Sequence, residues 1–313
     1  MDNRIEEIKV NSFRAWVLAA RPKTLIGASV PIILGFAYIL KDNSFIGLRQ
    51  ILPLLLCFIF AFIMQIDANF INDYYDCLRG NDKAEYRLGP LRACSQGWIT
   101  LPMMKTAIKV TTCVAIIFGL PLIWYGGLEM VIVGILCLLF AFLYTTKLSY
   151  LGLGDLLVLI FFGIVPVTLT YYLSSPIGFQ VITFEVFITS ISCGLVIDTL
   201  LVVNNYRDRD NDLKDNKRTL IVFLGEKGGE YLYLYLGVFA VVMQEVLFMC
   251  SDSFYKFFSM LLVLPYLVLH ISAYRKMKYI NHGRKLNMIL SITARNIFIY
   301  GLLTAASILF LKL

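Results

Sequence analysis

The segment QIDANFINDYYD, residues 65–76, closes an apolar run that begins near residue 51. A second segment of the same character, NNYRDRDND at residues 204–212, closes the apolar run near 182–203. Acidic and amide side chains at the end of a membrane helix are costly unless they line a cavity or face water. The two segments therefore predict a membrane protein that gathers polar groups at the ends of two helices.

The composition of the whole chain also indicates a membrane protein. Hydrophobic residues make up 59% of the 313 residues and charged residues only 16%, whereas soluble domains average about 45–50% apolar and about 25% charged residues. The apolar content excludes an ordinary soluble enzyme and a disordered chain. The seven cysteines form no CxxC pair and lie mostly inside apolar runs, so we interpret them as structural thiols.

Nine apolar stretches are long enough to cross a bilayer, which takes about 20 residues of helix. We expect an all-α integral membrane protein with nine transmembrane helices, in which residues 1–313 form a single domain. Pro166 lies inside the fifth stretch, and we expect a bend there. The stretches lie near residues 24–40, 51–71, 106–125, 128–146, 155–173, 182–203, 231–250, 257–274 and 288–311.

Lysine and arginine are distributed unevenly over the connections between these stretches. The N-terminal segment and the second-to-third, sixth-to-seventh and eighth-to-ninth connections carry most of them, and with nine spans these segments share one side. Short basic loops stay in the cytoplasm, so we expect a cytoplasmic N-terminus and an external C-terminus. Topology and attraction to anionic membrane lipids then account for the net charge of +7, with no nucleic-acid partner.

The spacing of the polar residues places each acidic segment on one helix face. Gln65, Asn69, Asn72 or Asp73, and Asp76 step by three or four residues, which aligns them on a helix. In the second segment Asn204, Asp208 and Asp212 repeat at intervals of four. The two stripes suggest a shared chemical purpose, although each segment can also be a solvated loop start that only ends its helix.

Facing carboxylates repel each other unless a cation joins them. Magnesium prefers oxygen ligands and is usually held by one or two carboxylates together with substrate phosphate oxygens. Basic residues beside the carboxylates are suited to the remaining phosphate charge. The pattern therefore predicts a clamp for Mg²⁺ and a diphosphate, with candidate basic partners at Arg79, Arg87, Arg92, Lys217 and Arg218.

These residues resemble the UbiA superfamily of intramembrane aromatic prenyltransferases. The string NDYYD at 72–76 matches the NDxxD motif of the family, DRDND at 208–212 matches its second motif, DxxxD, and nine helices is the architecture of the family. The strings RLGPLR at 87–92 and NNYRD at 204–208 are most similar to members that prenylate 1,4-dihydroxy-2-naphthoate in menaquinone biosynthesis. The string TKLS at 146–149 departs from the glycine- and proline-rich stretch expected there.

The resemblance implies a UbiA-type bundle with a polar cavity on the cytoplasmic side. It implies transfer of a polyprenyl group from polyprenyl diphosphate to 1,4-dihydroxy-2-naphthoate with loss of CO₂, and Mg²⁺ as the cofactor. Metal ligands would be Asp73, Asp76, Asp208 and Asp212, while Gln65 and Asn69 would orient or deprotonate the acceptor or hold diphosphate oxygens. The implied substrate-binding residues are Asn72, Arg79, Arg87, Arg92, Asn204, Asn205, Lys217 and Arg218.

Three alternatives stay open at this point. The acceptor can be another aromatic compound, such as 4-hydroxybenzoate, a chlorin or a haem ring. A cation-coupled transporter also binds cations through intramembrane acids, but those acids lie near the bilayer midplane on broken helices, whereas here they cluster at helix ends. A lipid-binding scaffold without catalysis is the third alternative.

Overall fold

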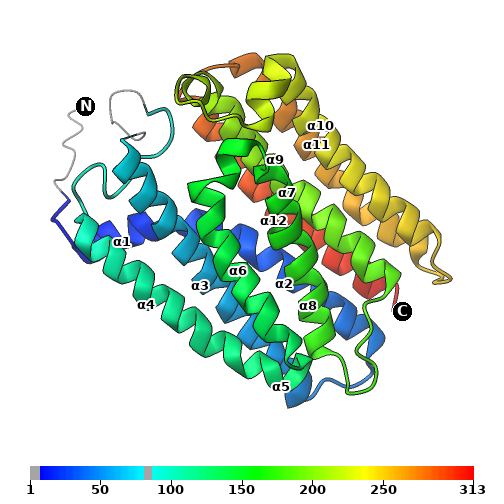
Figure 1. Cartoon of the computed structure of the whole chain (residues 1–313). Helices are drawn as coiled ribbons and strands as arrows, with labels where there is room; N and C mark the ends of the chain where they lie inside the picture. Colours follow the sequence, from blue (N-terminus) through cyan, green and yellow to red (C-terminus); the bar gives the residue numbers. More distant parts are fainter. Residues whose placement is uncertain (1–7, 81–86) are drawn as a thin grey trace.

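The structure is a computed structural model that describes residues 8–80 and 87–313, and all regular elements of these residues are helical. Figure 1 shows a bundle in which the long helices run roughly side by side. In chain order the elements are α1 (Phe13–Ala20), α2 (Pro22–Asp42), α3 (Leu48–Arg79), α4 (Leu101–Gly119), η1 (Leu120–Leu122), α5 (Ile123–Gly126), α6 (Glu129–Thr146), η2 (Leu148–Leu151), α7 (Gly154–Val158), η3 (Leu159–Ile164), α8 (Val165–Ser174), α9 (Phe184–Lys214), α10 (Leu220–Met249), α11 (Lys256–Ile280) and α12 (Leu286–Phe310).

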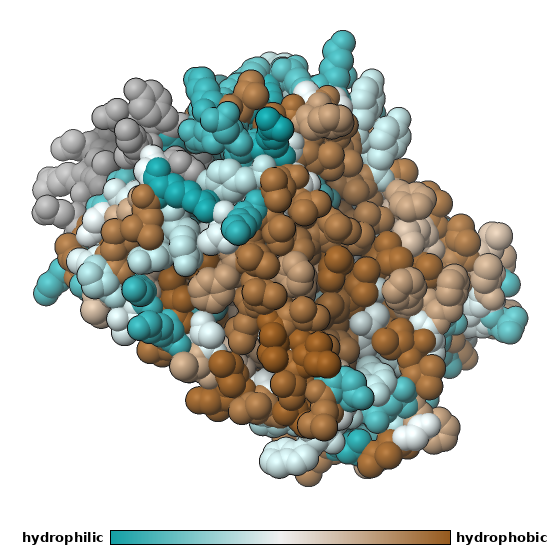
Figure 2. Space-filling view, in the orientation of Figure 1, coloured by the Kyte–Doolittle hydropathy of each residue, from teal (hydrophilic) through white to brown (hydrophobic). Residues whose placement is uncertain are grey.

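The expectation of nine membrane spans is confirmed for the described residues. Nine helical stretches are long and apolar enough to cross a membrane, and the third and fifth of them are each built from more than one element, Leu101–Gly126 and Gly154–Ser174. Figure 2 shows a broad hydrophobic surface across the middle of the bundle, with hydrophilic side chains concentrated toward its upper end. The protein is an integral membrane protein.

The two helices that carry the acidic segments are longer than their apolar runs. α3 has 32 residues and α9 has 31, which corresponds to about 48 Å and about 46 Å at 1.5 Å per residue. The hydrocarbon core of a bilayer is only about 30 Å thick. The last turns of both helices therefore extend beyond the hydrocarbon and carry their polar residues out of it.

The main core joins α2, α8, α9, α10, α11 and α12. Large side chains such as Tyr38, Tyr266 and Tyr300 are at most 1% exposed within it. A buried hydroxyl group needs a hydrogen-bond partner, and Tyr38 meets this need through Thr189, 2.8 Å away on α9. Aromatic bulk and shared hydroxyl contacts thus fix α9 in the centre of the bundle.

The bend expected at Pro166 takes the form of a π-helical turn. The six residues of η3 precede α8, whose second residue is Pro166. Gly163 in this turn lies directly against α9, because a Cβ atom built on Gly163 would come within 2.6 Å of the Gly194 Cα atom and the Ser190 carbonyl oxygen. Two backbones meet here without intervening side chains.

We predict that Gly163→Ala destabilises the bundle, because backbone atoms of α9 occupy the space of the new methyl group. Overpacking of this kind costs about 1–3 kcal/mol, measurable as a lower thermal unfolding midpoint in detergent. Gly27→Ala on α2 is the matched control, since nothing lies within 4 Å of its Cβ position. Equal midpoints for the two variants would contradict the close contact between η3 and α9.

Candidate functional site

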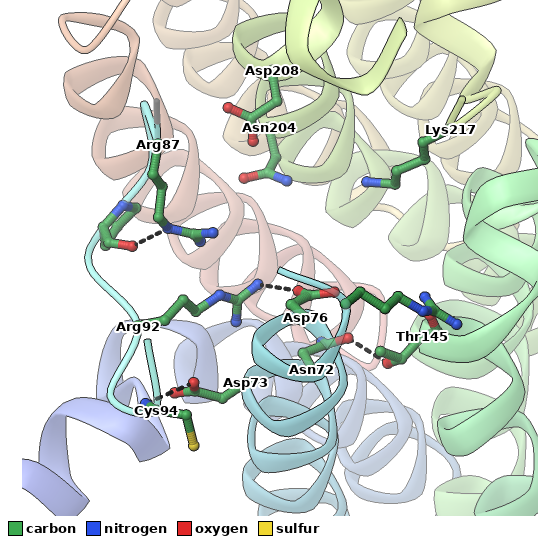
Figure 3. A network of polar contacts seen from close by, with 12 residues as sticks. Asn72, Asp73, Asp76, Arg87, Arg92, Cys94, Thr145, Asn204, Asp208 and Lys217 are labelled. Carbon is green, nitrogen blue, oxygen red and sulfur yellow. Dashed lines mark hydrogen bonds and ion pairs between the residues drawn. The ribbon is translucent and has the colours of Figure 1, made fainter. Parts of the chain in front are cut away.

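The two acidic segments meet at the same end of the bundle. Asn72 and Asp76 from α3 lie across an open space from Asn204 and Asp208 on α9, and Lys217 extends into that space from the α9–α10 connection (Figure 3). Residues more than a hundred positions apart in the chain are thereby brought together. Residues of both stripes predicted from the sequence therefore face the same space.

Arg87 interacts electrostatically with carboxylates of both acidic segments. Burial and the positive charge of Arg21 lower the pKa of Arg87, the carboxylates of Asp208 and Asp76 raise it, and the net result is a pKa of about 10. Arg87 therefore feels the charge of a carboxylate from each motif. With a pKa of about 10 Arg87 stays positively charged at neutral pH.

Two of the acidic residues are paired with cations. Arg92 Nη2 donates a hydrogen bond of 3.0 Å to Asp76 Oδ2, and Lys217 Nζ lies 3.4 Å from Asp212 Oδ1. The second oxygen of Asp212, Oδ2, is buried and has no hydrogen-bond partner among the described residues. Since a buried carboxylate oxygen is costly to leave without a partner, Asp212 has free capacity for a cation.

Asp73 is used differently from Asp76. Its side chain is 1% exposed, and its two oxygens accept the backbone N–H groups of Ala93 and Cys94 at 2.9 and 3.1 Å. Figure 3 shows the carboxylate turned toward Cys94, away from the space that Lys217 enters. A role of Asp73 as a metal ligand would require these two hydrogen bonds to break.

The second motif contains an ion pair between neighbouring residues. Arg207, whose side chain is 1% exposed, binds both oxygens of Asp208 through Nε and Nη2, and Nη2 also donates to Asn204 Oδ1 at 2.8 Å. Bidentate pairs of this kind fix geometry as well as charge. Arg207 therefore sets where the Asp208 carboxylate lies.

Two more of the predicted binding residues, Asn72 and Arg79, form hydrogen bonds with the end of α6. Thr145 Oγ1 donates a hydrogen bond to Asn72 Oδ1, while Arg79 Nη1 donates to the Thr145 carbonyl oxygen at 3.0 Å. The guanidinium of Arg79 also lies over the ring of Tyr150, 4.6 Å from its centroid. Cations stabilise the carboxyl end of a helix, and Arg79 serves α6 in this way.

Gln65 and Asn69 lie deeper than Asp76 on α3. Asn69 Nδ2 donates to the Ala20 carbonyl oxygen at 2.9 Å and to Thr24 Oγ1 at 3.0 Å. Gln65 Nε2 also approaches Thr24 Oγ1, at 3.4 Å, and its carbonyl oxygen Oε1 is buried with no hydrogen-bond partner among the described residues. Gln65 Oε1 is thus a hydrogen-bond acceptor without a partner among the described residues, and it lies deeper along α3 than the charged groups.

The remaining predicted residues are less central. Asn205 is buried in α9, and Arg218 is exposed and donates its backbone N–H to the Tyr150 carbonyl oxygen at 3.1 Å. Asp67 accepts hydrogen bonds from Thr111 and Thr112 at the contact between α3 and α4, so it pairs with neighbours outside the site.

Arg21 belongs to the site but was not among the predicted binding residues. Burial lowers its pKa, the carboxylates of Asp73 and Asp76 raise it, and Arg207 lowers it. Its backbone has φ of 52°, where it ends α1 and precedes α2. The Arg21-Pro22 pair marks this break in the sequence, but nothing in the local pattern shows that the side chain turns toward residues of α3 and α9.

A largely apolar cavity with a volume of about 490 Å³ begins beside these polar groups. Gln65, Asn72 and Tyr144 line one part of it, and Cys57 and Leu173 line another. From Asn72 to Cys57 the cavity follows α3 for about 22 Å at 1.5 Å per residue. The site thus combines a charged mouth with a long hydrocarbon-like interior.

Residues 28–309 match the UbiA prenyltransferase family. A 1,4-dihydroxy-2-naphthoate octaprenyltransferase of Escherichia coli is 34% identical over 70% of this chain and 71% of its own length. The enzyme of the same name from Haemophilus influenzae is 35% identical over 73% of this chain and 75% of its own length.

Solved structures share the fold at low sequence identity. A UbiA homologue from Archaeoglobus fulgidus bound to DMAPP and Mg²⁺ has a TM-score of 0.59 at 16% identity, covering 93% of this chain and 99% of that one. A UbiA homologue from Aeropyrum pernix has a TM-score of 0.61 at 15% identity, covering 92% and 98%. These likenesses confirm the expected bundle architecture.

We predict that Asp73→Ala loosens the chain around Ala93 and Cys94, because their N–H groups lose their acceptor. Each unsatisfied buried group costs about 1–3 kcal/mol, so amide hydrogen exchange in a peptide covering residues 88–100 should accelerate. Asp67→Ala, which removes a carboxylate from the other side of α3, should leave that peptide unchanged. Exchange at the wild-type rate in Asp73→Ala would contradict the anchoring role.

Proposed function

Because the chain belongs to the UbiA prenyltransferase family, we propose that it transfers a polyprenyl group from polyprenyl diphosphate to 1,4-dihydroxy-2-naphthoate, as a step of menaquinone biosynthesis. The observation that carries the proposal is the charged mouth formed by Asp76, Asp208 and Lys217, with Asp212 paired to Lys217, at the head of an apolar cavity. The names of its relatives supply the acceptor. A transporter is disfavoured, because these carboxylates lie at helix ends rather than at the bilayer midplane.

The mouth carries oxygen ligands of the kind that Mg²⁺ prefers, and no group of three or more His, Cys, Asp or Glu side chains among the described residues is already close enough together to hold a metal ion. Asp76, Asp208 and the unpartnered Oδ2 of Asp212 are hard ligands, and Asn72 offers a neutral oxygen beside them. We propose these residues as the metal and diphosphate-facing set, with Asp73 anchoring the neighbouring loop. When bound, Mg²⁺ withdraws negative charge from the leaving diphosphate.

Cationic side chains complete the diphosphate site. Arg87 and Arg21 lie within electrostatic reach of the carboxylates, and Arg92 and Lys217 are already paired with Asp76 and Asp212. Preorganised charges stabilise a developing anion because they need no reorientation during the reaction. We propose that these four residues hold the diphosphate oxygens before and after the allylic C–O bond breaks.

The cavity accommodates the isoprenoid tail and protects the reacting carbon. Its apolar walls orient the tail more than they attract it, because lipid offers the tail a similar environment. Loss of diphosphate leaves an allylic cation, which the electron-rich ring attacks at the carbon bearing the carboxylate. The new C–C bond forms, CO₂ leaves with its bonding electrons returned to the ring, and tautomerisation gives the quinol. Exclusion of water by the apolar lining prevents hydrolysis of the cation.

Gln65 and Tyr144 are placed to receive the acceptor ring. Both line the cavity near its polar end, and the Gln65 Oε1 atom is without a partner among the described residues. We propose that Gln65 accepts a hydrogen bond from a naphthoate hydroxyl group, while Asn69, bound to Ala20 and Thr24, keeps the Gln65 environment rigid. We place the mouth at the cytoplasmic face of a bacterial cytoplasmic membrane, with the N-terminus inside and the C-terminus outside.

The direct test is to incubate the purified protein with Mg²⁺, a radiolabelled polyprenyl diphosphate and either 1,4-dihydroxy-2-naphthoate or 4-hydroxybenzoate. We expect a prenylated naphthalene product and an equal amount of CO₂ with the first acceptor only. Turnover of 4-hydroxybenzoate alone would overturn the choice of acceptor. Binding of the diphosphate without transfer to either compound would favour a lipid-binding scaffold.

We predict that Asp76→Asn and Asp208→Asn each lower the rate of prenyl transfer at least about 100-fold, since both remove negative charge from the proposed cation site. Asp67→Asn is the matched control on α3, because Asp67 bonds to Thr111 and Thr112 away from the mouth. It should retain most of the activity. Comparable losses in all three variants would argue against a localised charged site.

We predict that Ala61→Trp distinguishes donors by length. Ala61 lines the cavity and lies about 16 Å from Asn72 along α3 at 1.5 Å per residue, so an indole there fills the interior and leaves the mouth open. Transfer from a long polyprenyl diphosphate should fall, while transfer from geranyl diphosphate should persist. Equal losses for both donors would place the tail elsewhere.

A further inference from the structure

The loop at residues 87–94 is anchored to two distant parts of the bundle. Toward α3, Arg92 binds Asp76, and the N–H groups of Ala93 and Cys94 bind Asp73. At its other end the loop meets the start of α12, where Arg284 Nη2 donates to the Arg87 carbonyl oxygen at 3.3 Å. The 87–94 loop therefore connects the first acidic motif to the last membrane helix.

Asn287, in the first turn of α12, makes the central contact. Its Nδ2 atom donates to the Leu88 carbonyl oxygen at 2.8 Å, and its Oδ1 atom accepts from Arg207 Nη1 at 2.8 Å. One amide thus holds the 87–94 loop with its donor and the second motif with its acceptor. These are the two hydrogen-bonding ends that an asparagine side chain has.

Arg207 donates four hydrogen bonds within the protein, and all three of its side-chain nitrogens take part. Nε and Nη2 bind Asp208, Nη2 also binds Asn204, and Nη1 binds Asn287. A guanidinium engaged on all three nitrogens is a fixed support rather than a mobile ligand for a substrate. Its position determines that of the Asp208 carboxylate.

Gly89 brings the 87–94 loop directly onto that support. A Cβ atom built on Gly89 would lie 2.7 Å from Arg207 Nη2 and 3.1 Å from its Cζ atom. The backbone of the loop therefore packs against the guanidinium itself. Two independent contacts, one through Gly89 and one through Asn287, therefore fix the position of the loop relative to Arg207.

We propose that Asn287 is a positioning residue of the active site, which links the 87–94 loop to Arg207 and thereby holds the Asp208 carboxylate in place. The inference rests on the proposed function for the part that Asp208 plays in catalysis. The link itself is a property of the substrate-free protein. Groups that orient a metal-binding carboxylate typically change metal affinity or activity about 10-fold to 100-fold when removed.

The link can be tested without substrate by limited trypsin digestion after Arg87 and Arg92. Digestion reports the fraction of molecules in which the loop is open. In Asn287→Ala we expect cleavage about fivefold to tenfold faster than in the wild type, as the loss of one or two hydrogen bonds implies. Asn296→Ala is the matched control, because this buried asparagine on α12 bonds to the Leu269 carbonyl oxygen and the neighbouring Arg295, both away from the loop. It should leave the loop cleavage rate unchanged.

The catalytic part is tested by the Mg²⁺ concentration that gives half-maximal prenyl transfer. We expect this concentration to rise about 10-fold in Asn287→Ala, and to stay at the wild-type value in Asn296→Ala. In an Arg207→Lys background the Asn287→Ala change should have little further effect, because its action passes through Arg207.

Asn287→Asp distinguishes the contact with Leu88 from the contact with Arg207. It is also the variant to use if Asn287→Ala folds poorly. Aspartate still accepts from Arg207 but cannot donate to Leu88, so loop cleavage should rise while the Mg²⁺ requirement stays closer to the wild-type value. Unchanged cleavage and unchanged Mg²⁺ dependence in both Asn287 variants would overturn the proposal, and so would equal shifts in Asn296→Ala. If the wild-type protein transfers no prenyl group, the proposed function fails, while the cleavage rates still decide whether the link exists.

Discussion

Ionised carboxylates are not stable in hydrocarbon without partners, and the whole architecture follows from where the two acidic segments are placed. α3 and α9 continue beyond their apolar runs, so Asp76, Asp208 and Asp212 reach the end of the bundle while the helices remain anchored in the membrane. Asp67, in contrast, stays within the bundle and is satisfied by two threonine hydroxyl groups. Depth along the helix thus separates the acids of the mouth from a structural acid on the same helix.

The hydropathy pattern predicted nine spans because membrane helices must satisfy their backbone internally and cover a fixed thickness. Spacing by four also predicted the Asn204, Asp208 and Asp212 stripe. Spacing left Asn72 and Asp73 as alternatives on α3, because neighbouring residues of a helix point about 100° apart. The tertiary structure resolves this: Asn72 lines the cavity, and Asp73 binds backbone N–H groups of the 87–94 loop.

Local sequence patterns could not predict the features of the site that depend on contacts between distant parts of the chain. The sequence around Arg21 does not show which residues its side chain approaches. Asn287 stands at the start of an apolar stretch, and the local sequence there predicts a membrane helix but no contact of this side chain. Arg79 was predicted from its position beside the acids, yet it binds carbonyl oxygens at the end of α6. Charge near a motif indicates the region of a site, whereas the partner of each side chain depends on which helices pack together.

The contact of Gly163 with Gly194 couples two positions that the chain separates by a complete membrane crossing. A side chain at Gly163 meets the α9 backbone, and a side chain at Gly194 meets Leu159 on η3. Each glycine is therefore limited by a different neighbour, Gly163 by the backbone of α9 and Gly194 by Leu159. Among homologous sequences both positions should stay small, since a larger residue at either one would push η3 and α9 apart.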